Sequence, residues 1–156
     1  MKITSRDNSL LRHARFVRDG KDNESIFIEG LRLCEEALLS NLKIEAIIYS
    51  DHIARKDRAA KLIREIESVA IKSAAVSEEL LASISYTKTS QGIVVLASRP
   101  TIKENAFARC QTGTPLLVIL HRINNPVNLG AILRTAEAAG ATGALTTAGT
   151  TDPFSP

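Results

Sequence analysis

The sequence has no long apolar run and little cysteine, and each shortage excludes a class of protein. No stretch of the 156 residues approaches the roughly 18 consecutive apolar residues that a membrane helix needs. The N-terminal stretch "MKITSRDNSLLRHAR" has charges but no apolar segment followed by a small-residue cleavage site, so we expect neither secretion nor a membrane partner. Cys34 and Cys110 stand alone without CxxC spacing, which suggests neither a metal site nor a disulfide framework. We therefore expect a cytoplasmic protein without a metal.

Clustered histidines and a strong net charge are missing as well. His13, His52 and His121 are scattered along the chain, so they indicate no metal or nucleophile set. His121, near the end of a predicted strand, is more easily explained as structural than as catalytic. The formal net charge of +3 and the isoelectric point of about 9.0 suit an RNA or DNA partner, but they suit an ordinary basic enzyme equally well.

Apolar periodicity predicts alternating helices and strands over residues 1–100. Helices are predicted at residues 10–18, 31–41 and 57–70, with a short one after Ser77, and strands at residues 24–30, 44–50, 71–76 and 92–98. The longer helices have one apolar face, whereas the strands are apolar on both faces. We therefore expect an α/β fold, a sandwich of helices around a largely parallel or mixed sheet.

The composition changes after Arg99-Pro100. Residues 101–114 have weak periodicity and are predicted to be an interdomain linker with one helical turn at most. One βαβ unit follows, with strands at 115–123 and 143–149 and a helix at 129–139. A unit this small rarely buries enough surface to stand alone, so it needs further chain, the first domain or a partner to pack against. We favour truncation and expect the natural chain to continue beyond Pro156.

The stretch "NNPVNLGAILRTAEAAG" (residues 124–140) contains unusual polar residues at the start of the predicted helix. One face of the helix should cover the sheet with Leu129, Ile132, Leu133 and Ala136. Arg134 lies about 140° from Leu129 on the helical wheel and points away from that core. With Asn128 at the helix start, it can face a ligand above the carboxyl end of the strand, where open α/β sheets bind ligands. The alternative is structural: Asn128 caps the helix and Arg134 is solvated. The glycine spacing does not match GxGxxG, which disfavours a dinucleotide site.

Several stretches resemble one enzyme family. "NNPVNLGAILRTAEAAGATGAL" strongly resembles the first motif of the SpoU (TrmH-like) branch of the SPOUT RNA methyltransferases, an Asn-x-Gly-x-x-x-Arg-Thr-Ala run after a Pro-x-Asn turn. "SRDNSLLRHARFVRD" and "SIFIEGLRLCEEAL" are similar to the small substrate-binding domain that precedes the catalytic domain in many of these enzymes. "SYTKTSQGIVVLAS" resembles the end of that domain, although Ser90 stands where the family usually has proline, and "TTDPFSP" matches the segment after the second strand.

This resemblance implies a fold and a reaction. It implies a ribosomal-protein-like α/β/α RNA-binding domain over residues 1–100, and the first βαβ unit of a SPOUT trefoil-knot domain over residues 115–156. It further implies methyl transfer from S-adenosylmethionine to a ribose 2′-hydroxyl of ribosomal or transfer RNA. Arg134 is then expected to activate that hydroxyl or bind the neighbouring phosphate, and Asn128 to shape the site. Arg32 and Gln91 are the candidate RNA contacts, against the alternatives of an Arg32 ion pair with Glu35 or Glu36 and a simple turn at Gln91.

The chain also departs from the family. Its members continue for roughly another hundred residues through two motifs that tie the knot, form the cofactor pocket and normally provide the dimer interface. We therefore expect the S-adenosylmethionine pocket to lie beyond Pro156, the parent protein to be a homodimer, and the 156-residue chain to be inactive alone. Two alternatives remain: a stand-alone RNA-binding module with a relic βαβ unit, and an unrelated α/β enzyme with a chance motif.

Overall fold

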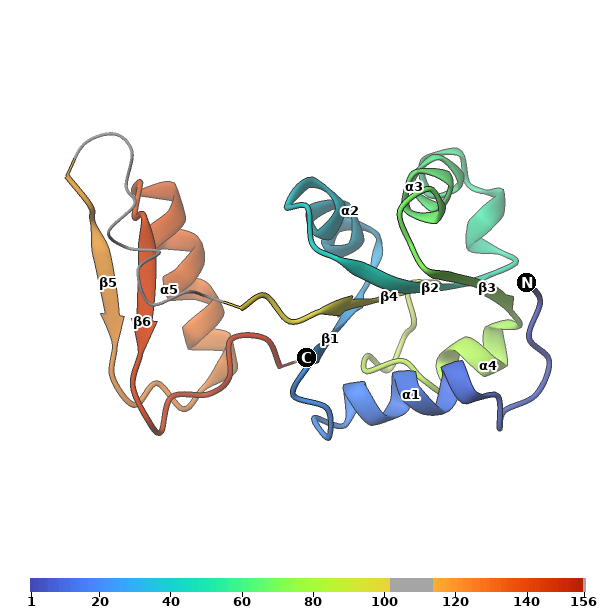
Figure 1. Ribbon diagram of the computed structural model, residues 1–156, viewed down its shortest axis with the longest axis horizontal. Coiled ribbons are helices and arrows are strands. Elements are labelled where there is room, and N and C mark those ends of the chain that lie inside the picture. The colour runs from blue at the N-terminus through green and yellow to red at the C-terminus, as the bar shows by residue number, and fades with distance from the viewer. Residues whose placement is uncertain (102–113, 156) are drawn as a thin grey trace. The chain divides into compact units, whose positions relative to one another are not determined.

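The computed structural model describes residues 1–101 and 114–155 (Figure 1). The chain divides into two compact units, which we call the N-terminal unit (Met1–Pro100) and the C-terminal unit (Thr101–Ser155). Most of the predicted linker, residues 102–113, lies outside the described residues. In the two described ranges, no helix combines the length and the apolar character that crossing a membrane requires.

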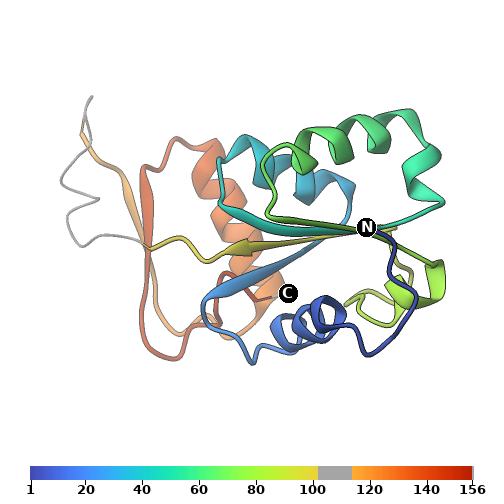
Figure 2. The same ribbon diagram turned by 45° about the vertical axis from the view of Figure 1, so that its right-hand side comes forward.

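The N-terminal unit is a four-stranded mixed sheet with helices on both faces. Its elements are α1 (Ser9–Arg18), β1 (Ser25–Glu29), α2 (Leu31–Leu39), β2 (Ile44–Ser50), the 3-10 turn η1 (Ile53–Arg55), α3 (Asp57–Glu67), β3 (Lys72–Val76), α4 (Glu78–Ala82) and β4 (Ile93–Ser98). The strand order is β1-β4-β2-β3, with β4 antiparallel to β1 and β2, and with β2 parallel to β3. Helices α2 and α3 cover one face, and α1 and α4 cover the other (Figures 1 and 2). The predicted α/β sandwich with a mixed sheet is confirmed.

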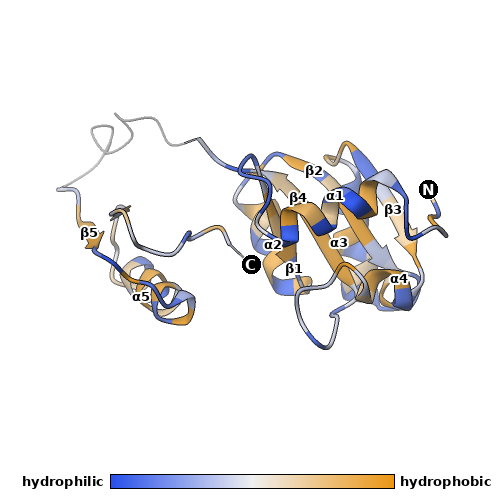
Figure 3. Cartoon of the chain, turned by 90° about the horizontal axis from the view of Figure 1, so that it is seen from below, coloured by the Kyte–Doolittle hydropathy of each residue, from blue (hydrophilic) through white to orange (hydrophobic). Residues whose placement is uncertain are grey.

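The central strand β4 supplies side chains to both cores. Val94 and Leu96 belong to the cluster under α1 and α4, whereas Ile93 and Val95 belong to the cluster under α2 and α3. All four are fully buried, which explains why the sequence of this strand is apolar without alternation. Figure 3 shows the same pattern, with β2 and β4 mostly orange between helices whose outer faces are blue.

The predicted element boundaries hold to within about three residues in this unit. The strand predicted at residues 44–50 is β2 itself. Ser77 caps α4 as predicted, since its side chain accepts a hydrogen bond from the Leu80 N–H at 3.3 Å. The third helix ends at Glu67, short of the predicted residue 70.

The C-terminal unit is the predicted βαβ unit, with β5 (Leu117–Leu120), α5 (Pro126–Ala138) and β6 (Gly143–Thr146). The two strands pair in parallel, and Ile119 lies opposite Leu145. Strand β5 is shorter than the predicted 115–123. It ends before the predicted residue 123 because Arg122 adopts a left-handed conformation (φ 52°) that turns the chain out of the extended path.

The predicted start of α5 at Leu129, with Asn128 as the first helix residue or cap, was wrong by three residues. The helix begins at Pro126, a residue well suited to the first helical position because it has no N–H to leave unpaired. The cap is Asn125, whose Oδ1 accepts from the N–H groups of Val127 at 2.9 Å and Asn128 at 3.2 Å. Asn128 therefore lies inside the first turn, and its side chain is not the cap.

A hydrogen-bonded carboxylate ties α1 to the start of β1. Asp22 Oδ1 accepts from the Glu24 N–H at 2.8 Å and the Ser25 N–H at 3.2 Å, and Oδ2 lies 3.1 Å from both Ser25 Oγ and His13 Nε2. Burial raises the pKa of Asp22, but the hydrogen bonds from Glu24, His13 and Ser25 outweigh it and hold this pKa below its ordinary value.

We predict that Asp22→Asn lowers the free energy of unfolding by about 1–2 kcal/mol at neutral pH, because a charge-assisted acceptor is lost. Since the folded pKa is depressed, this contribution is complete above the unfolded pKa of about 3.9 and is lost as pH falls through the folded pKa. Urea unfolding of both proteins at neutral pH and at low pH measures it. Asp7→Asn, at an exposed aspartate, is the matched control and should be neutral. A difference between wild type and Asp22→Asn that grew toward low pH would contradict the assignment.

Candidate functional site

Strands β1, β2 and β3 finish at the same end of the sheet, where β4 begins, and we call this the exit end. Arg32 and Gln91 both lie at the exit end. Gly30 follows β1 with φ 99°, and its N–H donates to the Ile93 carbonyl at 3.1 Å. A Cβ at Gly30 would lie 2.6 Å from Gln91 Oε1, so the Gln91 side chain packs directly on this glycine. Arg32 stands two residues further on, in the first turn of α2. Both predicted RNA contacts are exposed at the same end of the sheet.

A second glycine continues this contact toward β2. Gly92 has φ 84°, and a Cβ there would lie 2.8 Å from Ile53 Cβ. Ile53 is a buried residue that begins η1, the turn directly after β2. The exit end is therefore one continuous packed surface that runs from α2 through Gln91 and Gly92 to η1.

The predicted alternative for Arg32, an ion pair with Glu35 or Glu36, is not formed. Glu35 is engaged by Arg58, whose Nε and Nη2 donate to its two carboxylate oxygens at 2.8 and 2.6 Å. This bidentate hydrogen bond from Arg58 holds the pKa of Glu35 below its ordinary value. Among the ion pairs of the described residues Arg32 has none, so its guanidinium is available to a ligand.

A carboxylate that sequence reasoning missed shapes the loop before Gln91. Glu29 accepts hydrogen bonds from the N–H groups of Tyr86 at 2.8 Å and Thr87 at 3.1 Å, and from Thr87 Oγ1 at 2.9 Å. These bonds fix the stretch 85–91, which carries the exposed Lys88. In the sequence Glu29 is simply an acidic residue directly before Gly30. An ordinary solvent-facing side chain was the simpler interpretation of it.

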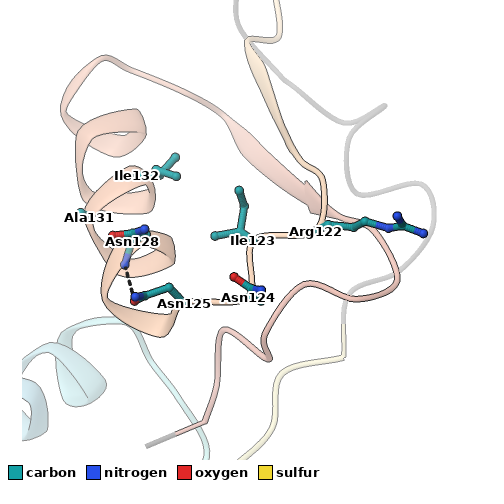
Figure 4. Close-up of a pocket in the computed structure, with 7 residues that line it drawn as sticks. All are labelled: Arg122, Ile123, Asn124, Asn125, Asn128, Ala131 and Ile132. Atoms are coloured by element: carbon teal, nitrogen blue, oxygen red, sulfur yellow. Dashed lines mark hydrogen bonds between the residues drawn. The ribbon is translucent and has the colours of Figure 1, made fainter.

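In the C-terminal unit, Asn128 faces a pocket between α5 and the turn that precedes it. The pocket has a volume of about 310 Å³ and is lined by Arg122, Ile123, Asn124, Asn125, Asn128, Ala131 and Ile132. Figure 4 shows Asn125 and Asn128 side by side at the start of the helix, whereas the Arg122 side chain points away from it. Amide groups therefore dominate the polar lining, and they can both donate and accept hydrogen bonds.

Arg134 does not line this pocket. It lies six residues after Asn128, which places the two about 120° apart around the helix. The prediction that Arg134 points away from the core is confirmed, because it is exposed while Leu129 is 2% exposed. Arg134 Nη1 lies 3.4 Å from the position that a Cβ of Gly130 would take, so the guanidinium runs back along the helix beside this glycine. Asn128 and Arg134 thus share the helix but lie on different sides of it.

His121 and Cys34 do not add to the site. His121 Nδ1 lies 2.9 Å from Thr147 Oγ1 and so joins the ends of β5 and β6, which agrees with the structural role predicted for it. Cys34 is buried, and burial raises the pKa of its thiol to about 12, so it stays protonated and unreactive.

Known proteins similar to this chain are RNA methyltransferases. The family "MRM3-like substrate binding domain" matches residues 12–95. The mitochondrial rRNA methyltransferase 3B of Danio rerio is 30% identical over 97% of this chain and 34% of its own length. The crystal structure of an rRNA methyltransferase from Sinorhizobium meliloti, also solved with S-adenosylmethionine, covers 99% of this chain with a TM-score of 0.79 at 27% identity. An RNA 2′-O ribose methyltransferase covers 100% of it with a TM-score of 0.71 at 27% identity.

The chain is shorter than these relatives. It spans 34% of the zebrafish protein, and 57% and 58% of the two solved chains. The similarity to these relatives covers both units, the α/β/α sandwich and the βαβ unit.

We predict that Gly92→Ala lowers the free energy of unfolding by roughly 2–5 kcal/mol, because it combines a left-handed backbone with a clash against the buried Ile53. Gly20→Ala is the matched control: its φ is 68°, but nothing lies within 4 Å of the added Cβ, so strain alone should cost roughly 1–2 kcal/mol. Chemical unfolding of both variants gives the difference. Equal losses in the two variants would show that the Ile53 contact contributes nothing.

Proposed function

The chain belongs to the SpoU (TrmH-like) family of RNA methyltransferases, with an MRM3-like substrate-binding domain, and on this premise we propose that its protein methylates a ribose 2′-hydroxyl of ribosomal or transfer RNA. The methyl donor is S-adenosylmethionine, as in the solved relative. The single observation that carries the proposal is the position of the Asn128–Arg134 motif on α5, in a unit whose fold follows that of RNA methyltransferases. A cytoplasmic location stays a prediction from the sequence.

The N-terminal unit is the RNA-binding domain in this proposal. Its support is the family match over residues 12–95, together with the exposed Arg32 and Gln91 at the exit end. An unpaired guanidinium suits a phosphate, because its planar fork presents donors to two phosphate oxygens. The Gln91 amide, held against Gly30, can donate and accept at a base edge or a 2′-hydroxyl.

Arg134 holds the RNA phosphate next to the reactive ribose, and Asn128 orients the nucleotide from the amide-lined pocket. A ribose hydroxyl is a poor nucleophile, so its proton must be drawn away while its oxygen is held in line with the methyl group. When bound, S-adenosylmethionine would supply the methyl group, and the 2′-hydroxyl would give up its proton to solvent water. Arg134 favours this step by holding the neighbouring phosphate and stabilising the negative charge that develops on the oxygen.

The described residues do not fit a complete S-adenosylmethionine site. Open α/β sheets bind such ligands where neighbouring crossovers run to opposite faces, and the described sheet of the C-terminal unit has two strands and one crossover. We therefore derive no step from a cofactor contact of this chain, and we infer that the 156 residues alone transfer no methyl group.

The proposed protein is a homodimer. One face of the β5-β6 sheet is apolar and exposed. Its side chains Leu117, Ile119 and Leu145 are 37%, 67% and 40% exposed. Ile119 and Leu145 are register partners, so the exposure is contiguous. Apolar surface of this kind needs a cover, either further chain or a second copy.

A second candidate is a stand-alone RNA-binding module. The observation that favours it is the contrast between the units: the N-terminal unit has two buried clusters around a four-stranded sheet, whereas the described C-terminal unit buries chiefly Leu120 and Leu129.

We predict that Arg134→Ala lowers methyl transfer to total RNA by on the order of 10²–10³-fold and weakens RNA binding far less, because one phosphate contact among several is lost together with the stabilisation of the developing oxyanion. The measurement uses the product of the complete open reading frame, labelled S-adenosylmethionine, and mapping of the product to the ribose. Arg64→Ala, at an exposed helix arginine of the N-terminal unit, is the control and should retain full activity. Unchanged transfer in Arg134→Ala would remove Arg134 from the chemistry. No transfer by the wild type, with RNA binding intact, would favour the binding module.

We also predict that the 156-residue chain binds S-adenosylmethionine weakly or not at all, since the described sheet lacks a second crossover. Isothermal titration calorimetry of the chain with S-adenosylmethionine checks this, with the Sinorhizobium meliloti rRNA methyltransferase, which was solved with S-adenosylmethionine, as the positive control. Micromolar binding by the 156-residue chain alone would contradict it.

A further inference from the structure

The turn after β2 belongs to the same surface as the predicted RNA contacts. Gln91 packs on Gly30 beside α2, and the next residue, Gly92, packs on Ile53 of η1. The turn therefore sits against the start of β4, close to the Gln91 side chain rather than at a remote part of the sheet. Arg55 is the last residue of this turn, and Lys56 directly follows it.

The exit end carries exposed cations that form no ion pair among the described residues. Arg32, Arg55, Lys56 and Lys88 are all exposed, and none of them forms an ion pair among the described residues. They come from three different segments, namely the first turn of α2, the η1 turn and the loop fixed by Glu29.

Most of the acidic side chains at this end have partners. Asp51 pairs with Lys2 at 2.7 Å, Glu29 receives three hydrogen bonds from the 85–91 loop, and Glu35 is held by Arg58. Three acidic residues form no ion pair among the described residues. Asp57 lies in the first turn of α3, and Glu78 and Glu79 begin α4 beyond the edge strand β3. Among the described residues along the β1, β4 and β2 part of the exit end, the four unpaired cations therefore outnumber the one unpaired carboxylate, Asp57.

We propose that Arg55 and Lys56 are further RNA contacts, which bind backbone phosphates next to those held by Arg32 and Lys88. The proposal rests on the proposed function of the N-terminal unit as an RNA-binding domain, and it sets the course of the RNA across the ends of β1, β4 and β2. Cations spaced along a strip suit a nucleic-acid backbone, because each successive phosphate meets a separate positive charge. Gln91, in the middle of the strip, is then the residue positioned to contact a base or a 2′-hydroxyl.

The test is the salt dependence of RNA binding by the 156-residue chain. Fluorescence anisotropy with a labelled RNA hairpin gives the affinity of the wild type and of the double variant R55A/K56A across a range of salt concentrations. We expect roughly tenfold weaker binding at physiological salt, and a slope of log affinity against log salt that is smaller by about two, one for each lost phosphate contact.

The matched control is the double variant K43A/K72A. Lys43 and Lys72 are exposed, free of ion pairs among the described residues, and located at the opposite end of the sheet, where β2 and β3 begin. The control removes the same charge from the same unit, so it accounts for the general loss of attraction to RNA. Circular dichroism melting of both variants verifies that each remains folded.

The outcomes separate this inference from the proposed function. A steep loss in R55A/K56A with little change in K43A/K72A supports it. Equal losses in the two double variants overturn it, as does a loss in R32A without one in R55A/K56A, and in both cases RNA binding by the unit stands. Absence of RNA binding by the wild-type chain overturns the inference together with the RNA-binding role of the N-terminal unit.

Discussion

The close packing at Gly30 and Gly92 is the constraint on which the N-terminal unit depends. Both glycines adopt positive φ values, and both lie so close to a neighbouring side chain that a Cβ would collide with it. Gly30 lets the chain leave β1 and enter α2 underneath Gln91, and Gly92 lets β4 begin against Ile53. Three separate segments thereby meet at the exit end, and their exposed cations come to lie on one surface.

In the C-terminal unit, the amide side chains between β5 and α5 have two different roles: one caps the helix and others line the pocket. Asn125 caps the helix through two backbone N–H groups, which leaves Asn124 and Asn128 among the polar residues of the pocket. One turn further on, Gly130 leaves room for the Arg134 guanidinium to lie along the helix. A rigid helix start thus presents an amide-lined pocket on one side and an arginine on another, an arrangement suited to holding a nucleotide and its phosphate separately.

The sequence predicted the elements well and the contacts between them poorly. Strand β2 was recognisable because both of its faces are buried, and helix α3 because burial of one face imposes an apolar period on it. The start of α5 was misplaced because the run Asn124-Asn125-Pro126 offers more than one possible cap, and only the backbone geometry selects Asn125. The roles of Glu29 and of the η1 turn could not be predicted, since they depend on contacts with residues 86–92 that are remote in sequence. Arg32 and Gln91 were found by resemblance, and their proximity is visible only in the fold.

Ultraviolet cross-linking of the 156-residue chain to RNA, followed by peptide mapping, shows whether RNA binds across the exit end of the sheet. We predict cross-links in residues 29–32, 53–56 and 86–92, the three segments that meet there. Cross-links confined to the opposite end, around Lys43 and Lys72, would contradict binding at the exit end, because those residues share the unit and its charge but not the surface.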